Sequence, residues 1–196
     1  MRIVGGGLAG RRLAGLGAGA PSALRPTSDK VRESLFNILA HGDFPPLEGA
    51  RVLDLFAGSG ALGLEALSRG AARAVFVEED PKARALIREN VEALGLIGET
   101  KIFRRDATRL GPHRGAPFDI VFLDPPYGKG LGERALSAAR AGGWLSDGAL
   151  AVLEETAAAD PQPEGFEERD RRRYGDTEIR LFRLAALSPD PAAPSP

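Results

Sequence analysis

The sequence predicts an α/β protein built on a mostly parallel sheet, and three observations lead to that fold class. Short apolar runs typical of buried strands alternate with amphipathic stretches typical of helices between residues 51 and 154. The first run, residues 52–55, breaks into a glycine-rich turn at 56–60, and a helical pattern follows at once. Acidic residues stand at the ends of four predicted strands. Right-handed crossovers bring the carboxyl ends of parallel strands to one edge, where such sheets bind ligands.

The composition predicts one globular domain with a small appendage. The chain has 196 residues, of which 43% are hydrophobic and 27% are charged, values that are ordinary for a soluble protein. It contains no cysteine, which excludes disulfides and thiolate chemistry and is compatible with a reducing compartment such as the cytoplasm. His41 and His113 lie far apart in the sequence, so we expect no metal site. We also expect a monomer.

Positive charge gathers at the N-terminus, although the net charge of the whole chain is only −1. Residues 1–32 hold six basic side chains and one acidic one, which gives +5 and leaves −6 for the rest. A basic segment on an acidic body is typical of proteins that bind nucleic acid. The arginines that we expect to contact the substrate are Arg2, Arg11, Arg12, Arg25 and Arg32.

Neither an export signal nor a membrane span is expected. Residues 13–20 form a short stretch in which three of eight residues are glycine, which is too polar in its backbone for an inserting segment. No run approaches the ~18 apolar residues that a spanning helix needs. The chain is therefore expected to have no membrane partner.

The first 48 residues are expected to form a hairpin, an irregular stretch and a helix. Residues 1–4 and 11–13 are predicted to pair, while residues 14–24 are rich in glycine and alanine and have no periodicity. Thr27 or Ser28 is placed to cap a helix that continues to about residue 40. Its apolar stripe is interpreted as core packing.

The main domain is expected to alternate strands and helices up to a terminal hairpin. A helix is expected to begin at Pro81 and to face inward through Ala85, Leu86, Val91 and Leu94. The remaining predicted elements are strands at 74–77, 101–104 and 118–123, a helix at 132–141, a turn at Asp147 and Gly148, a strand at 149–154, and paired strands at 166–174 and 177–184. The hairpin closes the sheet with an antiparallel edge.

The turn after the first strand is predicted to bind a nucleotide-type ligand. Gly58 and Gly60 let the backbone approach the ligand, and the helix behind them offers free N–H groups to an anion. The same glycine spacing, with Glu78 at the distance of a ribose ligand, also fits NAD. Asp54 separates the two interpretations, because its carboxylate would repel a pyrophosphate but suits a cationic amino group. S-adenosylmethionine carries an ammonium, a carboxylate and a ribose.

A second motif, Asp124-Pro125-Pro126-Tyr127, follows the strand at 118–123. The prolines stiffen the backbone and donate no hydrogen bond, so carbonyls near them and the Asp124 carboxylate serve as acceptors. An exocyclic amine is the group that such acceptors hold, with its lone pair aimed at an electrophilic methyl group while Tyr127 stacks on the ring. Whether Asp124 also removes the proton stays open. All four residues are candidate catalytic residues.

With both motifs identified, the chain resembles the class I S-adenosylmethionine-dependent methyltransferases. Within them it resembles the bacterial family that methylates guanine N2 in 16S ribosomal RNA. The resemblance covers residues 1–184, and its family-specific part is Arg25-Pro26-Thr27 followed by residues 31–37. The matching segments are 1–3, 10–13, 25–27 with Asp29, 31–37, 53–70 and 122–127. The stretch at 14–24 and the proline-rich tail depart from the family pattern.

This resemblance implies a Rossmann-like sheet of seven strands, mostly parallel, with the last strand antiparallel. It implies Asp54 and the glycine turn at the methionine end of S-adenosylmethionine, Glu78 at the ribose, and Asp106 with Ala107 near adenine. The full set of cofactor-binding candidates is Asp54, Phe56, Ala57, Gly58, Ser59, Gly60, Glu78, Asp106, Ala107 and Thr27. We expect an N-terminal extension over 1–48 that helps hold RNA, a methyltransferase domain over 49–187 and a disordered tail over 188–196. The implied partner is 16S ribosomal RNA or a small-subunit assembly particle.

Four other functions compete with this hypothesis. DNA adenine-N6 methyltransferases and protein glutamine-amide methyltransferases use a similar motif, in which Asp or Asn is followed by two prolines and an aromatic residue. Little of the chain remains outside the sheet to read a DNA sequence, and the arginines favour a phosphate backbone over a protein substrate. An NAD-dependent dehydrogenase is disfavoured by Asp54. A non-catalytic RNA-binding module leaves residues 124–127 without a role.

Overall fold

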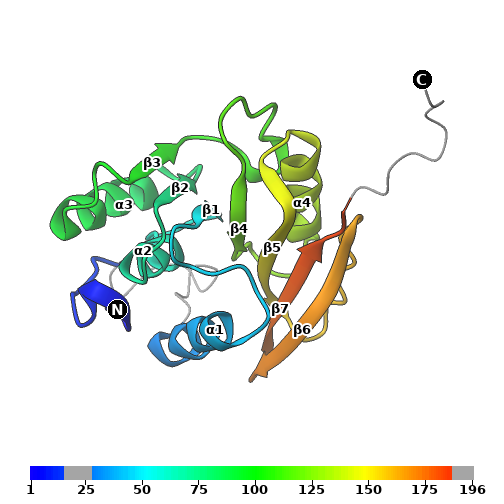
Figure 1. The fold of residues 1–196 in the computed structure, drawn as a ribbon, viewed down its shortest axis with the longest axis horizontal. Coiled ribbons are helices and arrows are strands. Elements are labelled where there is room, and N and C mark those ends of the chain that lie inside the picture. Colours follow the sequence, from blue (N-terminus) through cyan, green and yellow to red (C-terminus); the bar gives the residue numbers. More distant parts are fainter. Residues whose placement is uncertain (16–27, 187–196) are drawn as a thin grey trace.

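The protein is a seven-stranded sheet with helices on both faces (Figure 1). The computed structural model describes residues 1–15 and 28–186. The strands are β1 (Arg51–Leu55), β2 (Arg73–Val77), β3 (Thr100–Phe103), β4 (Phe118–Leu123), β5 (Leu145–Thr156), β6 (Phe166–Tyr174) and β7 (Thr177–Leu184). Their order in space is β3-β2-β1-β4-β5-β7-β6. The pairs from β3 to β5 are parallel, and β7 is antiparallel to both β5 and β6, which confirms the predicted fold class.

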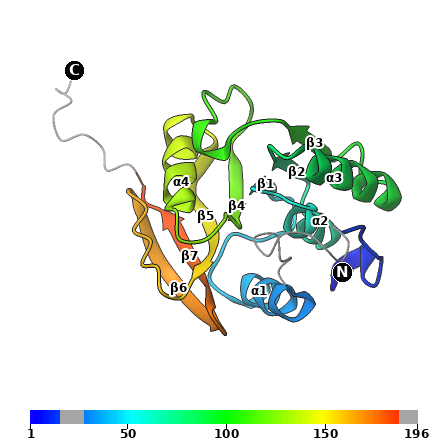
Figure 2. The same ribbon diagram turned by 180° about the vertical axis from the view of Figure 1, so that it is seen from behind.

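The helices divide between the two faces of the sheet. They are α1 (Asp29–His41), α2 (Ala61–Ser68), α3 (Pro81–Leu94) and α4 (Leu131–Ala141), with short 3-10 turns η1 (Gly6–Leu8) and η3 (Ala107–Arg109). Buried side chains of α1, α2 and α3 pack in one cluster with one face of the strands, while α4 and η3 pack in a second cluster on the other face (Figures 1 and 2). The central strands are therefore covered on both sides.

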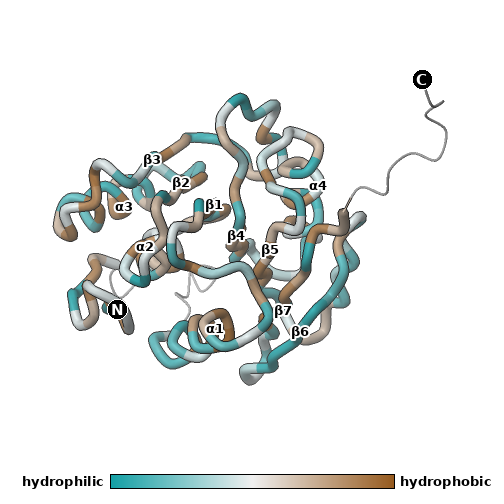
Figure 3. The backbone as a smooth tube through the Cα atoms, viewed as in Figure 1, coloured by the Kyte–Doolittle hydropathy of each residue, from teal (hydrophilic) through white to brown (hydrophobic). Residues whose placement is uncertain are grey.

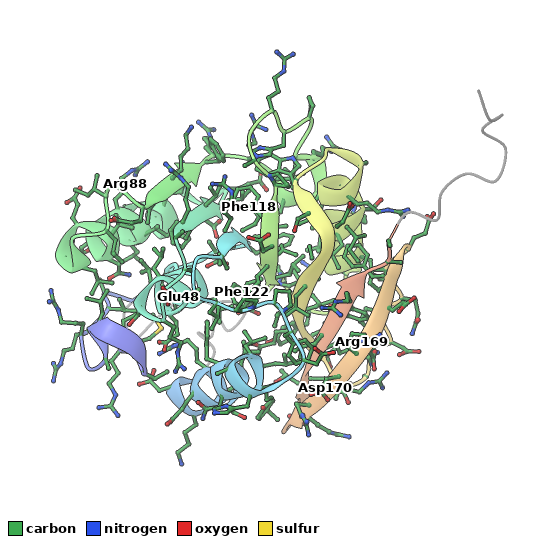
Figure 4. All side chains as sticks on the ribbon, in the orientation of Figure 1. Glu48, Arg88, Phe118, Phe122, Arg169 and Asp170 are labelled. Carbon is green, nitrogen blue, oxygen red and sulfur yellow. The ribbon has the colours of Figure 1, made fainter. Side chains whose placement is uncertain are left out.

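Hydropathy follows this layering. β4 is apolar at five of its six positions and buried at the same number, whereas β6 at the edge is polar and mostly exposed (Figure 3). Figure 4 shows Phe118 and Phe122 of β4 in the interior and Arg169 and Asp170 on the outer strand. A charged, exposed edge strand discourages pairing with other chains.

Most predicted bounds agree with the structure, but two expectations are wrong. Strands β4, β6 and β7 have the predicted residues. Helix α3 buries Val91 and Leu94 as predicted, but Ala83 and Ile87 take the inward positions expected for Ala85, which is exposed, and Leu86, which is half-buried. The predicted turn at Asp147 and Gly148 lies inside β5, which is continuous.

The pairing of β5 with β4 shifts its register near the predicted turn. Between two neighbouring pairs with β4, the register advances by two residues on β4, from Phe118 to Ile120, but by five on β5, from Leu145 to Leu150. The extra residues are accommodated by Gly148, whose φ of 71° lies in the left-handed region that favours glycine. The strand bulges here and resumes its pairing with β4.

The N-terminal extension packs into the main core. Arg2 and Arg12 form an antiparallel bridge, which confirms the pairing of the two short segments. Ile3 is fully buried and Leu13 is 7% exposed, and both belong to the cluster that contains α1, α2 and α3. Residues 16–24 of the expected irregular stretch and the expected tail at 188–196 lie outside the described residues. Within the described part of the chain, no helix is long and apolar enough to cross a membrane.

Candidate functional site

The candidate site lies where the strand order reverses, at the carboxyl ends of β1 and its two neighbours. Leu55 of β1 pairs with Val77 of β2 on one side and with Leu123 of β4 on the other. The residues that follow these three are Phe56, Glu78 and Asp124. Because the chain leaves β1 in one direction for β2 and β3 and returns on the other side for β4, this edge is a topological switch point, the usual ligand site of such sheets.

The turn between β1 and α2 has an unusual backbone. Gly58 and Gly60 have φ values of 56° and 79°, and Phe56 has a φ of 59°, the one positive value at a non-glycine residue in the described chain. A bulky side chain in this region costs of order 1–3 kcal/mol and persists where the surroundings require it. A Cβ atom at Gly58 would meet nothing within 4 Å, whereas one at Gly63 would come within 2.5 Å of the Phe76 ring. The turn is thus open outward and tightly packed inward.

Glu78 holds this turn through backbone hydrogen bonds. One carboxylate oxygen accepts from the Gly58 amide at 2.8 Å, and the other accepts from the Asp80 amide at 2.9 Å. Asp80 in turn caps α3, because its side chain accepts from the Ala83 amide at 2.8 Å. Glu78 therefore joins the end of β2 to the glycine turn of β1.

Asp54 is buried in β1 and points at the start of α2. Its side chain is 2% exposed, and Oδ2 accepts from the Gly63 amide at 2.9 Å. Burial raises the pKa of Asp54 to about 8, the Gly63 hydrogen bond opposes this shift, and the charge of Glu78 adds to it. The carboxyl is therefore mostly protonated at neutral pH in this state. A cation bound beside it would favour the ionised form, which is the form that complements an ammonium group.

Asp106 and Ala107 lie just beyond β3, at the start of η3. Asp106 Oδ1 accepts from the Thr108 amide at 2.8 Å and from the Thr108 hydroxyl at 2.7 Å. These hydrogen bonds hold the pKa of Asp106 below its usual value, so this carboxylate stays charged. Ala107 is 3% exposed and packs in the cluster beneath α4.

The Asp-Pro-Pro-Tyr segment leaves β4 at the same edge. Asp124 is half-buried, Pro125 is buried and Tyr127 is 40% exposed. The Tyr127 hydroxyl donates to Glu154 Oε1 at 2.6 Å. Burial raises the pKa of Tyr127, and the charges of Asp124 and Glu154 raise it further. The phenol is therefore a neutral hydrogen-bond donor on an exposed residue.

Three residues of this region were missed by reasoning from the sequence. Glu154 holds Tyr127, and the buried Glu155 accepts from the Gly128 amide at 2.9 Å, which fixes the loop after the motif. Their only sequence signal is a pair of acids at the end of a predicted strand. Asn90 is 1% exposed on α3 and donates to the Ser59 and Ala14 carbonyls at 3.0 and 3.1 Å. It thus ties the N-terminal segment to the glycine turn.

Three of the five predicted substrate arginines are on the surface, and one is not. Arg2, Arg11 and Arg12 are exposed on the N-terminal segment. Arg32 is fully buried and pairs with Asp29 at 2.8 Å and with Glu65 at 3.8 Å. A guanidinium with no exposed surface cannot reach a phosphate, so the expectation for Arg32 is wrong and its role is internal. Arg25 and the cofactor candidate Thr27 lie outside the described residues.

The residues at the turn fit S-adenosylmethionine. The cap residue Gly60 offers no side chain to the start of α2, and Asp54 accepts from the third amide, that of Gly63, so the two amides before it can face a carboxylate beside the open space at Gly58. Asp54 lies beneath the same turn and gains charge when a cation is near. Glu78 and Asp106 add carboxylates at the ends of the next strands. The amides of α2 suit the carboxylate of the methionine part, and Asp54 suits its ammonium group. The other two carboxylates suit the nucleoside part of the cofactor.

Known proteins resemble this chain in sequence over nearly its whole length. The family described as Conserved hypothetical protein 95 matches residues 1–183. Ribosomal RNA small subunit methyltransferase D of Escherichia coli K12 is 42% identical over 158 residues, which cover 79% of this chain and 74% of that protein. The protein of the same name from Haemophilus influenzae is 35% identical over 188 residues, which cover 93% of each.

Solved structures resemble the chain in fold. The yhhF protein of Escherichia coli superposes with a TM-score of 0.79 at 37% identity, over 95% of this chain and 99% of that one. An RNA methyltransferase from Salinibacter ruber, solved in complex with S-adenosyl-L-homocysteine, superposes with a TM-score of 0.60 at 15% identity. This second match covers 87% of this chain and all of the other, and at that identity it concerns the fold alone.

Proposed function

The chain belongs to the family of S-adenosylmethionine-dependent methyltransferases of the small ribosomal subunit, and we propose that it methylates the exocyclic N2 amine of a guanine in 16S ribosomal RNA. The observation that carries this proposal is the position of Asp124 to Tyr127. The segment leaves β4 directly beside the glycine turn of β1. The proposed site for the target amine and the proposed site for the methyl donor therefore share one edge of the sheet.

The donor end of the site consists of residues from three strands. S-adenosylmethionine, when bound, supplies the electrophilic methyl group. We propose that the amides at the start of α2 receive its carboxylate, that Asp54 faces its ammonium, and that Glu78 and Asp106 hold the ribose and adenine. Phe56, Ala57, Ser59 and Gly60 contribute the backbone of the turn, and Ala107 contributes the backbone beside adenine. Glu78 already positions Gly58 through the hydrogen bond at 2.8 Å.

The acceptor end orients the amine. Asp124 and carbonyls beside Pro125 and Pro126 accept the N–H bonds of the target amine, and Tyr127 stacks on its ring. With S-adenosylmethionine bound, the amine held by these acceptors would form its new N–C bond as the C–S bond of the donor breaks, and the electron pair of that bond would stay on sulfur. The nitrogen then loses a proton. The carboxylate contributes by positioning and by stabilising the positive charge that develops on nitrogen.

The RNA is proposed to approach along the N-terminal segment. Arg2, Arg11 and Arg12 are exposed there, and phosphate contacts by such side chains make binding salt-dependent. Deleting this segment would remove Ile3 and Leu13 from the core, so point substitution is the cleaner test. Replacing Arg11 and Arg12 together with glutamine should reduce the dependence of log K on log salt by about two. An unchanged slope would place the RNA elsewhere.

The modified nucleoside tests the proposed reaction. The protein is incubated with labelled S-adenosylmethionine and small-subunit RNA or assembly particles, and the RNA is digested for nucleoside analysis. Label in N2-methylguanosine is expected. Label in N6-methyladenine or in protein would contradict the guanine assignment. Because the proposed substrate is ribosomal RNA, we place the enzyme in the cytoplasm.

The role of Asp124 needs a separate test. Asp124→Ala should abolish methyl transfer while the affinity for S-adenosylhomocysteine, measured by calorimetry, changes little. Glu164→Gln, which changes an exposed acid outside the candidate site, serves as the control and should retain both properties. Substantial turnover in the Asp124 variant would remove this residue from the mechanism.

A further inference from the structure

Glu154 stands beside Asp124 at the acceptor end of the site. Strands β4 and β5 are parallel, and their last pair is Leu123 with Leu153. Asp124 directly follows the last residue of β4, and Glu154 is the next residue of β5. Leu123 and Leu153 pack in the cluster beneath α4, so alternation directs the two acidic side chains to the opposite face. Both carboxylates therefore lie on one face of the sheet at one edge.

The neighbours of Glu154 hold it in place. The Tyr127 hydroxyl donates to its Oε1 at 2.6 Å. The next residue, Glu155, is 4% exposed and accepts from the amides of Gly128 and Thr156 at 2.9 and 2.8 Å. The loop that carries Tyr127 is thus fixed to β5 at two points. The half-buried carboxylate of Glu154 is therefore held in one orientation, in which it can accept a further hydrogen bond.

A base that presents its amine to Asp124 brings the rest of its pairing edge toward Glu154. On the pairing edge of guanine, the ring nitrogen beside the N2 amine is N1, which carries a hydrogen and donates. On adenine the atom next to the N6 amine is also N1, which has no hydrogen and accepts. A carboxylate can only accept when ionised, and it has about four acceptor positions, so it serves Tyr127 and one further donor together. It attracts the guanine edge and repels the adenine edge.

We propose that Glu154 accepts the N1–H of the target guanine and is a specificity-determining residue of this enzyme. The inference rests on the proposed function, since it concerns the base whose N2 amine is methylated. Asp124 and the adjacent carbonyls hold the amine, Glu154 recognises the neighbouring ring nitrogen, and Tyr127 stacks. A site built around a substrate N–H discriminates strongly against an analogue that lacks it, because the site's polar group is then left unpaired.

The test compares guanosine with 2-aminopurine riboside at the modified position. This analogue keeps the 2-amine but has no hydrogen on N1. After the modified guanine has been mapped, each nucleotide is placed there by ligation, and kcat/KM is measured in the same RNA or particle. The native enzyme should prefer guanosine by about 100-fold or more. Glu154→Gln should lower this preference at least about 10-fold, because the glutamine amide can donate to N1 of the analogue.

Two further variants separate recognition from support of Tyr127. Tyr127→Phe removes the hydrogen bond to Glu154 but keeps the ring, so it should lower kcat/KM for both nucleotides and leave their ratio unchanged. Glu164→Gln makes the same chemical change on an exposed side chain and should leave the ratio as in the native enzyme. If Glu154→Gln leaves the ratio unchanged as well, Glu154 only supports Tyr127 and the inference is overturned. If the native enzyme forms no N2-methylguanosine, the proposed function itself fails.

Discussion

Replacing Asp54 with asparagine should stabilise the protein, and more so as the pH rises. Asp54 has its pKa raised from 3.8 to about 8 by burial in β1. Between these values the folded protein binds a proton that the unfolded chain has released. The native protein therefore loses stability as pH rises through this window and levels off above pH 8. Asparagine does not titrate, so the variant lacks this loss.

The size of the effect follows from the shift. Each pH unit inside the window changes the free energy of unfolding by at most about 1.4 kcal/mol for one proton. From pH 5 to pH 8 the stability of Asp54→Asn relative to the native protein should therefore grow by roughly 2–4 kcal/mol. The amide oxygen can still accept from the Gly63 amide, which Asp54 now bonds at 2.9 Å. The extra NH₂ group adds an offset that does not vary with pH.

Urea unfolding at pH 5, 6, 7, 8 and 9 measures this difference, because every other titrating group is common to both proteins. Asp147→Asn, the same change on an exposed side chain, is the control and should show no such growth. A difference between Asp54→Asn and the native protein that stays constant from pH 5 to pH 8 would refute the reasoning. Binding of S-adenosylhomocysteine should weaken about 10-fold in the variant, because the ammonium group of the ligand no longer faces the carboxylate of Asp54.

Three further substitutions test contacts around the site. Gly63→Ala should destabilise the protein by about 1–3 kcal/mol in urea unfolding, because its Cβ would lie 2.5 Å from the Phe76 ring; a neutral effect would mean that the ring moves aside easily. Asn90→Ala removes the bonds that join Ala14 to Ser59, so amide hydrogen exchange in residues 1–15 should accelerate and S-adenosylhomocysteine should bind more weakly; unchanged exchange would show that the segment is held by other contacts. Glu65→Ala removes the Glu65 partner of the buried Arg32, so the free energy of unfolding should fall by about 3–5 kcal/mol. A loss below about 1 kcal/mol would show that the pair is not coupled.

The elements that could be predicted are those whose signal is local. The bounds of β4 follow from an almost continuous apolar run, and those of β6 and β7 from turn residues between two strands. The glycine turn is visible because positive φ angles need glycine, and both Gly58 and Gly60 have them. Even so, the positive φ of Phe56 has no local signal, since it results from the way the turn is held between β1 and β2.

Other features depend on contacts between segments that are distant in the sequence. Arg32 looks like any basic residue of a charged segment, but Glu65, thirty-three positions away, pairs with it inside the core. Helix α3 turns Ile87 toward the sheet because the glycine turn and Phe76 lie there. The bulge at Gly148 exists because β5 must stay in register with β4. None of these partners can be identified from the residues on either side.

Reasoning from the sequence was sufficient for the strand that carries Asp54, the glycine turn after it, and the acidic, proline-rich acceptor segment at 124–127, because each needs particular residue types at neighbouring positions. Three features became visible in the folded protein: Asp54 is buried and mostly protonated, Glu154 lies beside Asp124, and Asn90 ties residues 1–15 to the turn. Burial, ionisation and cross-strand neighbours are properties of the folded sheet. They arise when the parallel register brings the ends of separate strands to one edge.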